Sequence, residues 1–311
     1  MHAASLPRWF RWLAYGALAY SVAVILFGAY VRATGSGAGC GDHWPTCHGE
    51  VIPRAPALQT QIEFTHRVTS GIALPFVLVV AAAASRLRAS RVVRVSAFAG
   101  VFFMVLEAAI GALLVKKQWV ATDASLSRAV AHAAHLVNTL FLLAAQTATC
   151  VFAGNVTAPK WRGQGARLWI LAGLCAGIMA LGASGAIAAL GDTLFPATSL
   201  ASGMADEFSN TAHFLVRLRV WHPLLALATL LALGWLYATS SPGQPGIPAR
   251  SALLIFSSLY AAQLVVGLVN LGLLAPIPLQ LVHLFLADAV WISLVGLVLW
   301  ALSEPAEAQS R

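Results

Sequence analysis

The sequence predicts an all-α integral membrane protein in which eight transmembrane helices form two related four-helix bundles. Of the 311 residues, 59% are hydrophobic and only 10% are charged, a composition foreign to soluble globular chains. Apolar runs of about 20 residues, long enough to cross about 30 Å of hydrocarbon, recur along the chain. Polar residues of the first half also recur in the second half at a nearly constant spacing. These observations exclude a soluble globular protein.

Eight apolar runs are predicted as membrane spans. They cover residues of about 12–33, 63–84, 95–115, 129–153, 167–190, 216–239, 251–274 and 279–302. The first run follows Arg8 and Arg11, is longer than the core of a signal peptide, and precedes no small-residue cleavage site. We therefore expect it to be a retained span.

The basic residues set the expected orientation. The net charge of +8 could suggest nucleic-acid binding, but Lys and Arg lie in short segments between spans, which favours a membrane surface. A cluster in the short loop after span 2 predicts that this loop is cytoplasmic: Arg86, Arg88, Arg91 and Arg94. Both termini are then cytoplasmic. We expect a multi-pass protein of a bacterial plasma membrane whose first outer loop covers residues 35–62.

The first outer loop carries a cysteine pair, Cys40 and Cys47, after a glycine-rich exit from span 1. Because this loop faces an oxidising compartment, a disulfide is favoured over free thiols. His43 and His48 lie beside the pair and leave open a zinc or copper site, although no second CxxC-type element supports it. Cys150 and Cys175 lie inside spans, where a thiol is typical of apolar packing.

Three charged or titratable residues stand at the start of span 2: Glu63, His66 and Arg67. Such groups are costly in a membrane, so they indicate function. Glu63 and His66 are three residues apart and are expected to share a helix face, with Arg67 on a neighbouring face.

Spans 3 and 4 carry further polar residues. Glu107 lies near the middle of span 3, where a functional carboxylate and a hydrogen-bonded structural carboxyl are equally compatible with the sequence. His135 lies about two turns into span 4, and we expect His132, nearer the interface, to be hydrated.

The second half repeats the first. His66 to His222, Glu107 to Gln263 and Gly111 to Gly267 are each 156 residues apart. His135 to His283 is 148 residues, because the loop before span 8 is shorter, and Gly28 to Gly182 is 154. The repeat predicts an N-terminal half of residues 1–155 and a C-terminal half of residues 156–311, related by a pseudo-two-fold axis along the membrane normal.

The repeated histidines predict two haem sites at one depth in the outer leaflet. His66 and His135 form one pair, and His222 and His283 form the other. Two imidazoles from facing helices are typical of axial haem ligands, whereas zinc would require four close ligands. Arginines at the same level are candidates for pairing with the haem propionates: Arg32, Arg67, Arg128, Arg217 and Arg219. No CxxCH motif is present for covalent attachment.

The two halves differ in their chemistry. The position that matches Glu63 in the second half is Arg219, and the outer loop at 191–215 has no cysteine. A carboxylate and a redox-capable cysteine pair therefore indicate that the first half is catalytic, and the second half is expected to hold a permanent haem.

Several segments resemble haem A synthases, and the resemblance runs from span 1 to span 8. The segments are Arg32 to Gly37, Cys40 to Cys47 with Trp44-Pro45, Glu63-Phe64-Thr65-His66-Arg67, His135 to Asn138, Trp221 to Leu224 and Gln280 to Leu284. That family oxidises the C8 methyl group of haem O to a formyl group through alcohol-level intermediates, and supplies haem A to terminal oxidases.

The resemblance implies a resident haem b on His222 and His283, and admission of substrate haem O near His66 and His135. It also implies that Glu63 is the functional carboxylate, which could orient a water, accept a proton or fix a ligand, and that Cys40 and Cys47 are the family's outer-loop pair. Some members carry a second cysteine pair after span 5, which this chain lacks. Expected partners are the bilayer, haem O, its synthase as donor and an unidentified electron acceptor. A homo-oligomer stays open, as does the alternative of a di-haem b electron carrier.

Overall fold

The computed structural model describes residues 6–54, 56–154, 156–239 and 247–303, and in these ranges it contains helices but no β-strand. Eight of the helices in this described part are long and apolar enough to cross a membrane. The predicted all-α, eight-span membrane fold is therefore confirmed. The pseudo-two-fold axis and the cytoplasmic placement of both termini stay predictions.

The spans of the first half are α1 to α4, and those of the second half are α5, α8, α9 and α10. The first four are α1 (Arg8–Ala33), α2 (Leu58–Arg86), α3 (Arg91–Lys116) and α4 (Leu126–Ala153). The last four are α5 (Ala166–Leu194), α8 (Trp221–Thr239), α9 (Ile247–Gly272) and α10 (Ile277–Leu302). Three short helices lie in the connections: η1 (Ser36–Ala38), α6 (Leu200–Glu207) and α7 (Phe214–Arg217).

The span helices start a few residues away from the sequence-based boundaries, and two of these differences affect the site. Helix α2 begins at Leu58, so Glu63 lies inside the helix rather than at its first residue. The predicted span 216–239 is divided, because α7 ends at Arg217 and α8 begins at Trp221. Pro223 favours the second start, since proline lacks an N–H group and is best tolerated in the first turn of a helix. At the other end of the first loop, α1 stops at Ala33 and Gly35 takes a positive φ of 67°.

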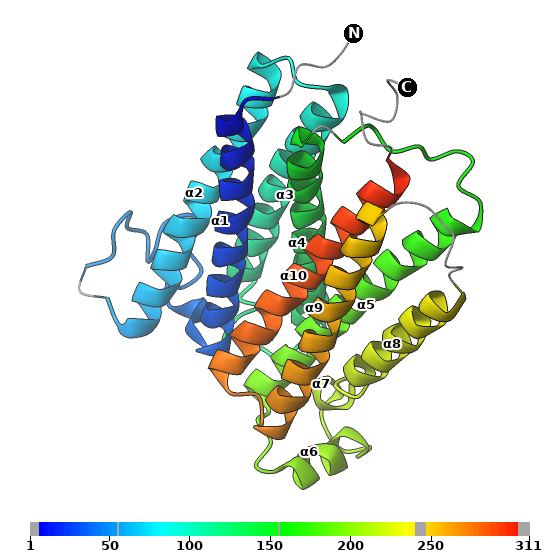
Figure 1. The fold of residues 1–311 in the computed structure, drawn as a ribbon. Helices are drawn as coiled ribbons and strands as arrows, with labels where there is room; N and C mark the ends of the chain where they lie inside the picture. The colour runs from blue at the N-terminus through cyan, green and yellow to red at the C-terminus, as the bar shows by residue number, and fades with distance from the viewer. Residues whose placement is uncertain (1–5, 55, 155, 240–246, 304–311) are drawn as a thin grey trace, which may run out of the picture.

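The helices run between two ends of the molecule (Figure 1). Helix α1 begins and α10 ends at the same end, which is uppermost in the figure. The loop residues 34–54 and the short helices α6 and α7 lie toward the opposite end, where α2, α4, α8 and α10 begin. Each of these four helices carries one histidine of the two predicted pairs.

Helix pairings of the first half recur in the second. Helix α3 packs against α4 as α9 packs against α10, and α1 packs against α2 as α5 packs against α8. Helix α4 also contacts α5 and α10, which brings the two halves together. Accordingly α4 is the most buried span: 72% of its most apolar 18-residue stretch is buried inside the protein. Trp291 crosses this boundary and donates from Nε1 to the carbonyl oxygen of Leu140 at 2.6 Å.

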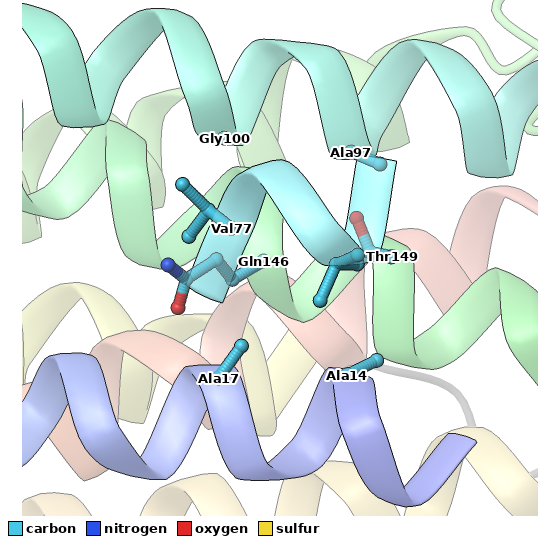
Figure 2. Close-up of a pocket in the computed structure, with 8 residues that line it drawn as sticks. Ala14, Ala17, Val77, Ala97, Gly100, Gln146 and Thr149 are labelled. Carbon is cyan, nitrogen blue, oxygen red and sulfur yellow. The ribbon is translucent and has the colours of Figure 1, made fainter. Parts of the chain in front are cut away.

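The first bundle is closely packed on the side away from the histidines. A cavity of about 10 Å³ remains between α1, α2, α3 and α4, and Ala14 and Ala17 of α1 point into it (Figure 2). Gln146 lies on its wall and donates from Nε2 to Ser21 Oγ at 2.9 Å. This volume suits about one water molecule and is far too small for a porphyrin.

Candidate functional site

The four histidines lie near the starts of the even-numbered spans, within about three turns of those starts. This places both pairs toward the end of the molecule that carries the cysteine loop and α6 (Figure 1). The structure brings His222 close to His283 in the second half. It also brings His66 within electrostatic range of His135 in the first half.

The second pair has the spacing of two ligands on opposite sides of one metal ion. The ring centroids of His222 and His283 are 6.2 Å apart, with an interplanar angle of 85°. A metal–nitrogen bond of about 2 Å on each side, added to the distance from nitrogen to ring centre, gives a separation of about 6 Å. The residues present therefore fit a bis-imidazole iron.

The hydrogen bonds of this pair leave one nitrogen of each ring without a protein partner. His222 Nδ1 lies 3.2 Å from the carbonyl oxygen of Leu181 and 3.1 Å from Ser184 Oγ. His283 Nε2 lies 3.3 Å from Gln263 Nε2, and its buried Nδ1 has no partner among the described residues. A neutral imidazole can bind a metal through either nitrogen.

Glycines on neighbouring helices make room for three of the four rings. A Cβ atom on Gly28 would lie 3.1 Å from His66 Cε1, and one on Gly185 or Gly267 would lie 2.9 Å from Cε1 of His222 or His283. Gly185 is therefore the structural counterpart of Gly28. The expected equivalence with Gly182 is wrong, because Gly182 faces leucine side chains of α4 instead.

The first pair has a different environment. The ring of His66 makes an edge contact with Phe27 at a centroid distance of 5.6 Å, and its buried Nδ1 has no partner among the described residues. His135 Nδ1 lies 3.4 Å from Glu107 Oε2. The nitrogen is not aligned for a hydrogen bond, so this contact is electrostatic. His132 differs from expectation, because its Nε2 is buried without a partner in the described part of the chain instead of being hydrated.

Glu63 anchors the cysteine loop to α2. Cys40 and Cys47 form a disulfide, which confirms the predicted pairing. The backbone N–H of Cys40 donates to Glu63 Oε2 at 2.8 Å, and the carboxylate also forms a short ion pair with Arg67, one turn along the helix. Glu63 therefore faces Arg67 and the loop. The predicted separation of Arg67 from Glu63 is wrong, because the two side chains form an ion pair; the shared face of Glu63 and His66 stays a prediction.

Arg67 is fully engaged by this arrangement. Its Nη1 donates to the carbonyl oxygens of His43 at 2.6 Å and Thr46 at 2.7 Å, while Nε and Nη2 face Glu63. Each donor group of the guanidinium thus has a partner in α2 or the loop. This geometry favours a loop clamp over the predicted propionate contact.

Arg32 connects the two halves. Nη1 donates to the carbonyl oxygen of Ala189 at 2.6 Å and to Thr193 Oγ1, and Nη2 donates to Gln280 Oε1 at 2.8 Å. The first two acceptors belong to α5 and the third to α10. Sequence reasoning missed this link, because no periodicity pairs span 1 with spans 5 and 8.

Arg219 and Arg217 differ although they are two residues apart. Arg219 is buried, forms an ion pair with Asp192 at 3.0 Å, and donates from Nη2 to the carbonyl oxygen of Phe195 at 2.6 Å. Arg217 is exposed and has no ion pair within the described ranges. Arg128, the fifth candidate, is buried and donates from Nη1 to the carbonyl oxygens of Ala121 at 2.8 Å and Asp123 at 2.5 Å. Of the five arginines predicted to pair with haem propionates, Arg217 is therefore the one whose guanidinium stays free for an anionic group. Asp192 was not predicted; its place at the end of span 5 was the available signal.

A groove of about 420 Å³ lies beside Arg217 at the outer end of the second half. Phe208, Phe214 and Trp221 supply its aromatic walls. Glu207, at the end of α6, also lines it. Burial raises the pKa of the Glu207 carboxyl, although the nearby Arg219 guanidinium acts in the opposite direction. The groove thus places one free cation among aromatic rings near His222.

Comparison with known families places these features in context. The sequence profile of COX15-CtaA, described as cytochrome oxidase assembly protein, matches residues 11–295. Over 307 residues the chain is 47% identical to a Thermus thermophilus protein named protoheme IX farnesyltransferase. That match covers 97% of this chain and 50% of the relative, so the chain spans about half of its length.

Shorter matches connect the chain to proteins named heme A synthase. It is 42% identical over 90 residues to the one from Alkalihalophilus pseudofirmus, a match covering 29% of this chain and 30% of that protein. It is 40% identical over 105 residues to the one from Exiguobacterium sp., covering 33% of this chain and 34% of the relative.

Proposed function

This chain belongs to the COX15-CtaA family of cytochrome oxidase assembly proteins, and on that premise we propose that it is a haem A synthase. The proposed reaction oxidises the C8 methyl group of haem O to a formyl group through hydroxylated intermediates. The similarity to heme A synthases supports an enzyme that acts on haem. The Thermus relative is named for a farnesyl transfer to protohaem, but this chain covers half of that protein, so the name does not assign that transfer to it.

We propose that His222 and His283 hold a resident haem b and that His66 and His135 hold the substrate haem O. The 6.2 Å separation of the second pair and the glycines that admit the rings support this assignment. The bound haem iron supplies the redox chemistry. Arg217, whose free guanidinium lines the groove with Trp221, is the proposed contact for a haem propionate.

One observation favours a haem-modifying enzyme over a haem carrier. Only the first half fixes a disulfide loop to the helix that carries its histidine, through Glu63 and Arg67. At the equivalent place in the second half, Arg219 is paired with Asp192. We therefore propose that residues 1–155 form the catalytic half and residues 156–311 the half with the permanent haem. Glu63 and the Cys40–Cys47 loop are the proposed catalytic elements.

The proposed setting is a bacterial plasma membrane with the haem sites toward the outer leaflet. The eight apolar spans establish a multi-pass membrane protein, and the basic cluster after α2 supports a cytoplasmic position for that loop. Oxidation of the methyl group to a formyl group, with water as the source of the oxygen atom, releases electrons and protons, so an electron acceptor is required. A haem O synthase is the proposed donor of the substrate.

A di-haem b electron carrier is the second candidate. The feature that favours it is the recurrence of a histidine pair with ring-accommodating glycines in both halves, because such sites alone serve electron transfer as well as chemistry. A carrier would leave its cofactor unaltered and would not require the carboxylate and disulfide loop of the first half.

Pigment analysis separates the two candidates. Cells that make haem O but no haem A would express the chain, and the extracted haems would be identified by chromatography and mass. Haem A or hydroxylated haem O is expected with the wild-type chain, and their absence would refute the enzyme. Glu63→Gln is expected to abolish product while haem b stays bound to the purified protein. Full conversion by Glu63→Gln would refute the role assigned to this carboxylate.

A further inference from the structure

We propose that Glu107 is a positioning residue whose carboxylate holds a negative charge beside the His135 ring. This charge makes His135 a stronger iron ligand than His283, its counterpart in the second half. The inference rests on the proposed haem sites. It concerns a carboxylate to which neither the sequence motifs nor the disulfide loop assigns a role.

Glu107 is held against His135 by two neighbouring side chains of α4. Asn138 Nδ2 donates to Glu107 Oε2 in a short hydrogen bond and to the carbonyl oxygen of Phe103 at 3.0 Å. Thr139 Oγ1 makes a short hydrogen bond with the other oxygen, Oε1. An amide nitrogen only donates, so the carboxylate oxygen beside His135 acts as an acceptor.

The contact with the carboxylate is made by Nδ1 of His135. Glu107 Oε2 lies 3.4 Å from Nδ1, and that nitrogen has no other partner in the described ranges. Nε2 is then left for a metal. The side chain of Glu107 is 18% exposed, and no Lys or Arg within those ranges lies at ion-pair distance from it. Its charge is therefore directed at the imidazole.

The second half lacks every part of this arrangement. Gln263 stands at the position of Glu107, 156 residues later, and contacts His283 with an uncharged amide. The two residues that hold the carboxylate have apolar counterparts 148 residues later, namely Leu286 for Asn138 and Ala287 for Thr139. The carboxylate and both of its hydrogen-bond donors thus occur together in one half and are absent together from the other.

The difference has a direct consequence for an iron ligand. A carboxylate beside the outer nitrogen of a metal-bound imidazole orients the ring and raises its basicity, and removal of such a group typically weakens metal binding or activity 10–100-fold. A more basic imidazole stabilises ferric over ferrous iron. The first-half site should therefore bind ferric haem more tightly, and at a lower reduction potential, than the same site with glutamine.

A structural tie between α3 and α4 is the competing explanation, and Glu107→Gln separates the two. Glutamine keeps an oxygen that can accept from Asn138 or Thr139, so the tie between the helices persists while the charge is lost. A purely structural role predicts no change in the reduction potential of either haem or in its affinity for the protein. The proposed role predicts a change confined to the haem of the first half.

The test uses the purified full-length chain in detergent, loaded with ferric protohaem as the probe and titrated potentiometrically in parallel with spectra. In Glu107→Gln we expect one of the two haems to shift to a higher potential and its affinity for protohaem to fall about 10–100-fold, while the other haem is unchanged. Gln263→Glu is the reciprocal control and should lower the potential of the other haem. Glu107→Asp keeps the charge and should retain most of the wild-type affinity.

The outcomes are distinct from those of the pigment assay. Unchanged potential and affinity in Glu107→Gln, with both haems bound, would overturn the inference even if the chain makes haem A. The predicted shifts in a chain that makes no haem A would uphold the inference and refute only the proposed reaction. A wild-type chain whose first half takes up no protohaem would overturn the inference together with the assignment of His135 as a ligand.

Discussion

Replacing Glu63 with alanine should destabilise the outer end of the first half far more than the loss of an ordinary surface ion pair. Glu63 is 3% exposed, and the Arg67 side chain is 11% exposed. The substitution leaves a buried guanidinium without its anion and the Cys40 backbone N–H without an acceptor. Removing one partner of a buried ion pair costs about 3–5 kcal/mol, since the other charge stays desolvated.

The chain contains a matched control. Glu50 and Arg54 form a second Glu–Arg pair with the same sequence spacing, at 3.8 Å, but the Arg54 side chain is 92% exposed. Such surface pairs contribute at most about 1 kcal/mol, so Glu50→Ala should have a small effect. Removing both charges in Glu63→Ala/Arg67→Ala should recover part of the loss, because no unpaired charge remains.

Reversible unfolding in mixed micelles would measure the free energies, and limited trypsin digestion would report loosening of the loop at Arg54. Faster cleavage and a loss of about 3–5 kcal/mol are expected for Glu63→Ala, against near wild-type behaviour of Glu50→Ala. Equal losses in the two variants would refute the reasoning, because the buried pair would then contribute no more than the exposed one.

Three further predictions concern the core of the fold. Gly185→Ala should displace His222 and reduce bound haem b in the absorption spectrum, because the new Cβ would lie 2.9 Å from the ring; Gly173→Ala, on the same helix with open space around it, should bind haem normally. Asp288→Ala should stabilise the protein by about 1–3 kcal/mol in an unfolding titration, because both oxygens of this 1% exposed carboxyl lack a partner in the described structure. A loss of stability would instead reveal a partner for that carboxyl. Arg32→Ala should cost at least about 3 kcal/mol in the same titration, since it removes charged hydrogen bonds to both α5 and α10 at about 1.5–3 kcal/mol each. An unchanged midpoint would show that Arg32 does not hold the two halves together.

The membrane fold could be predicted from the sequence because composition and the length of the apolar runs determine it. Eight apolar runs can satisfy their backbone groups in lipid only as helices, so the eight spans needed no tertiary information. The division between α7 and α8 was less accessible. Apolar residues lie on both sides of it, and the signals in the sequence are Arg217, Arg219 and Pro223, which interrupt the apolar run.

The histidine positions and the disulfide were also readable, since the repeat and the loop spacing mark them. The partners of the charged residues were not. Glu63 and Arg67 are four residues apart on one helix, a spacing that allows their ion pair, but only the path of the loop brings Cys40 and Thr46 over α2 as their further partners. The same holds for Glu107, whose hydrogen-bond partners Asn138 and Thr139 lie on a neighbouring helix.

The most direct test of the central claim compares two histidines at equivalent positions of the repeat. His135→Ala and His283→Ala would each be expressed with a haem O source, and the haems bound to the purified protein and extracted from the membranes would be identified by mass. We predict that His283→Ala loses the resident haem b. We predict that His135→Ala retains haem b but yields neither hydroxylated haem O nor haem A. The assignment of the two halves would be contradicted if His283→Ala retained haem b while His135→Ala lost it. It would also be contradicted if His135→Ala made as much haem A as the wild-type chain.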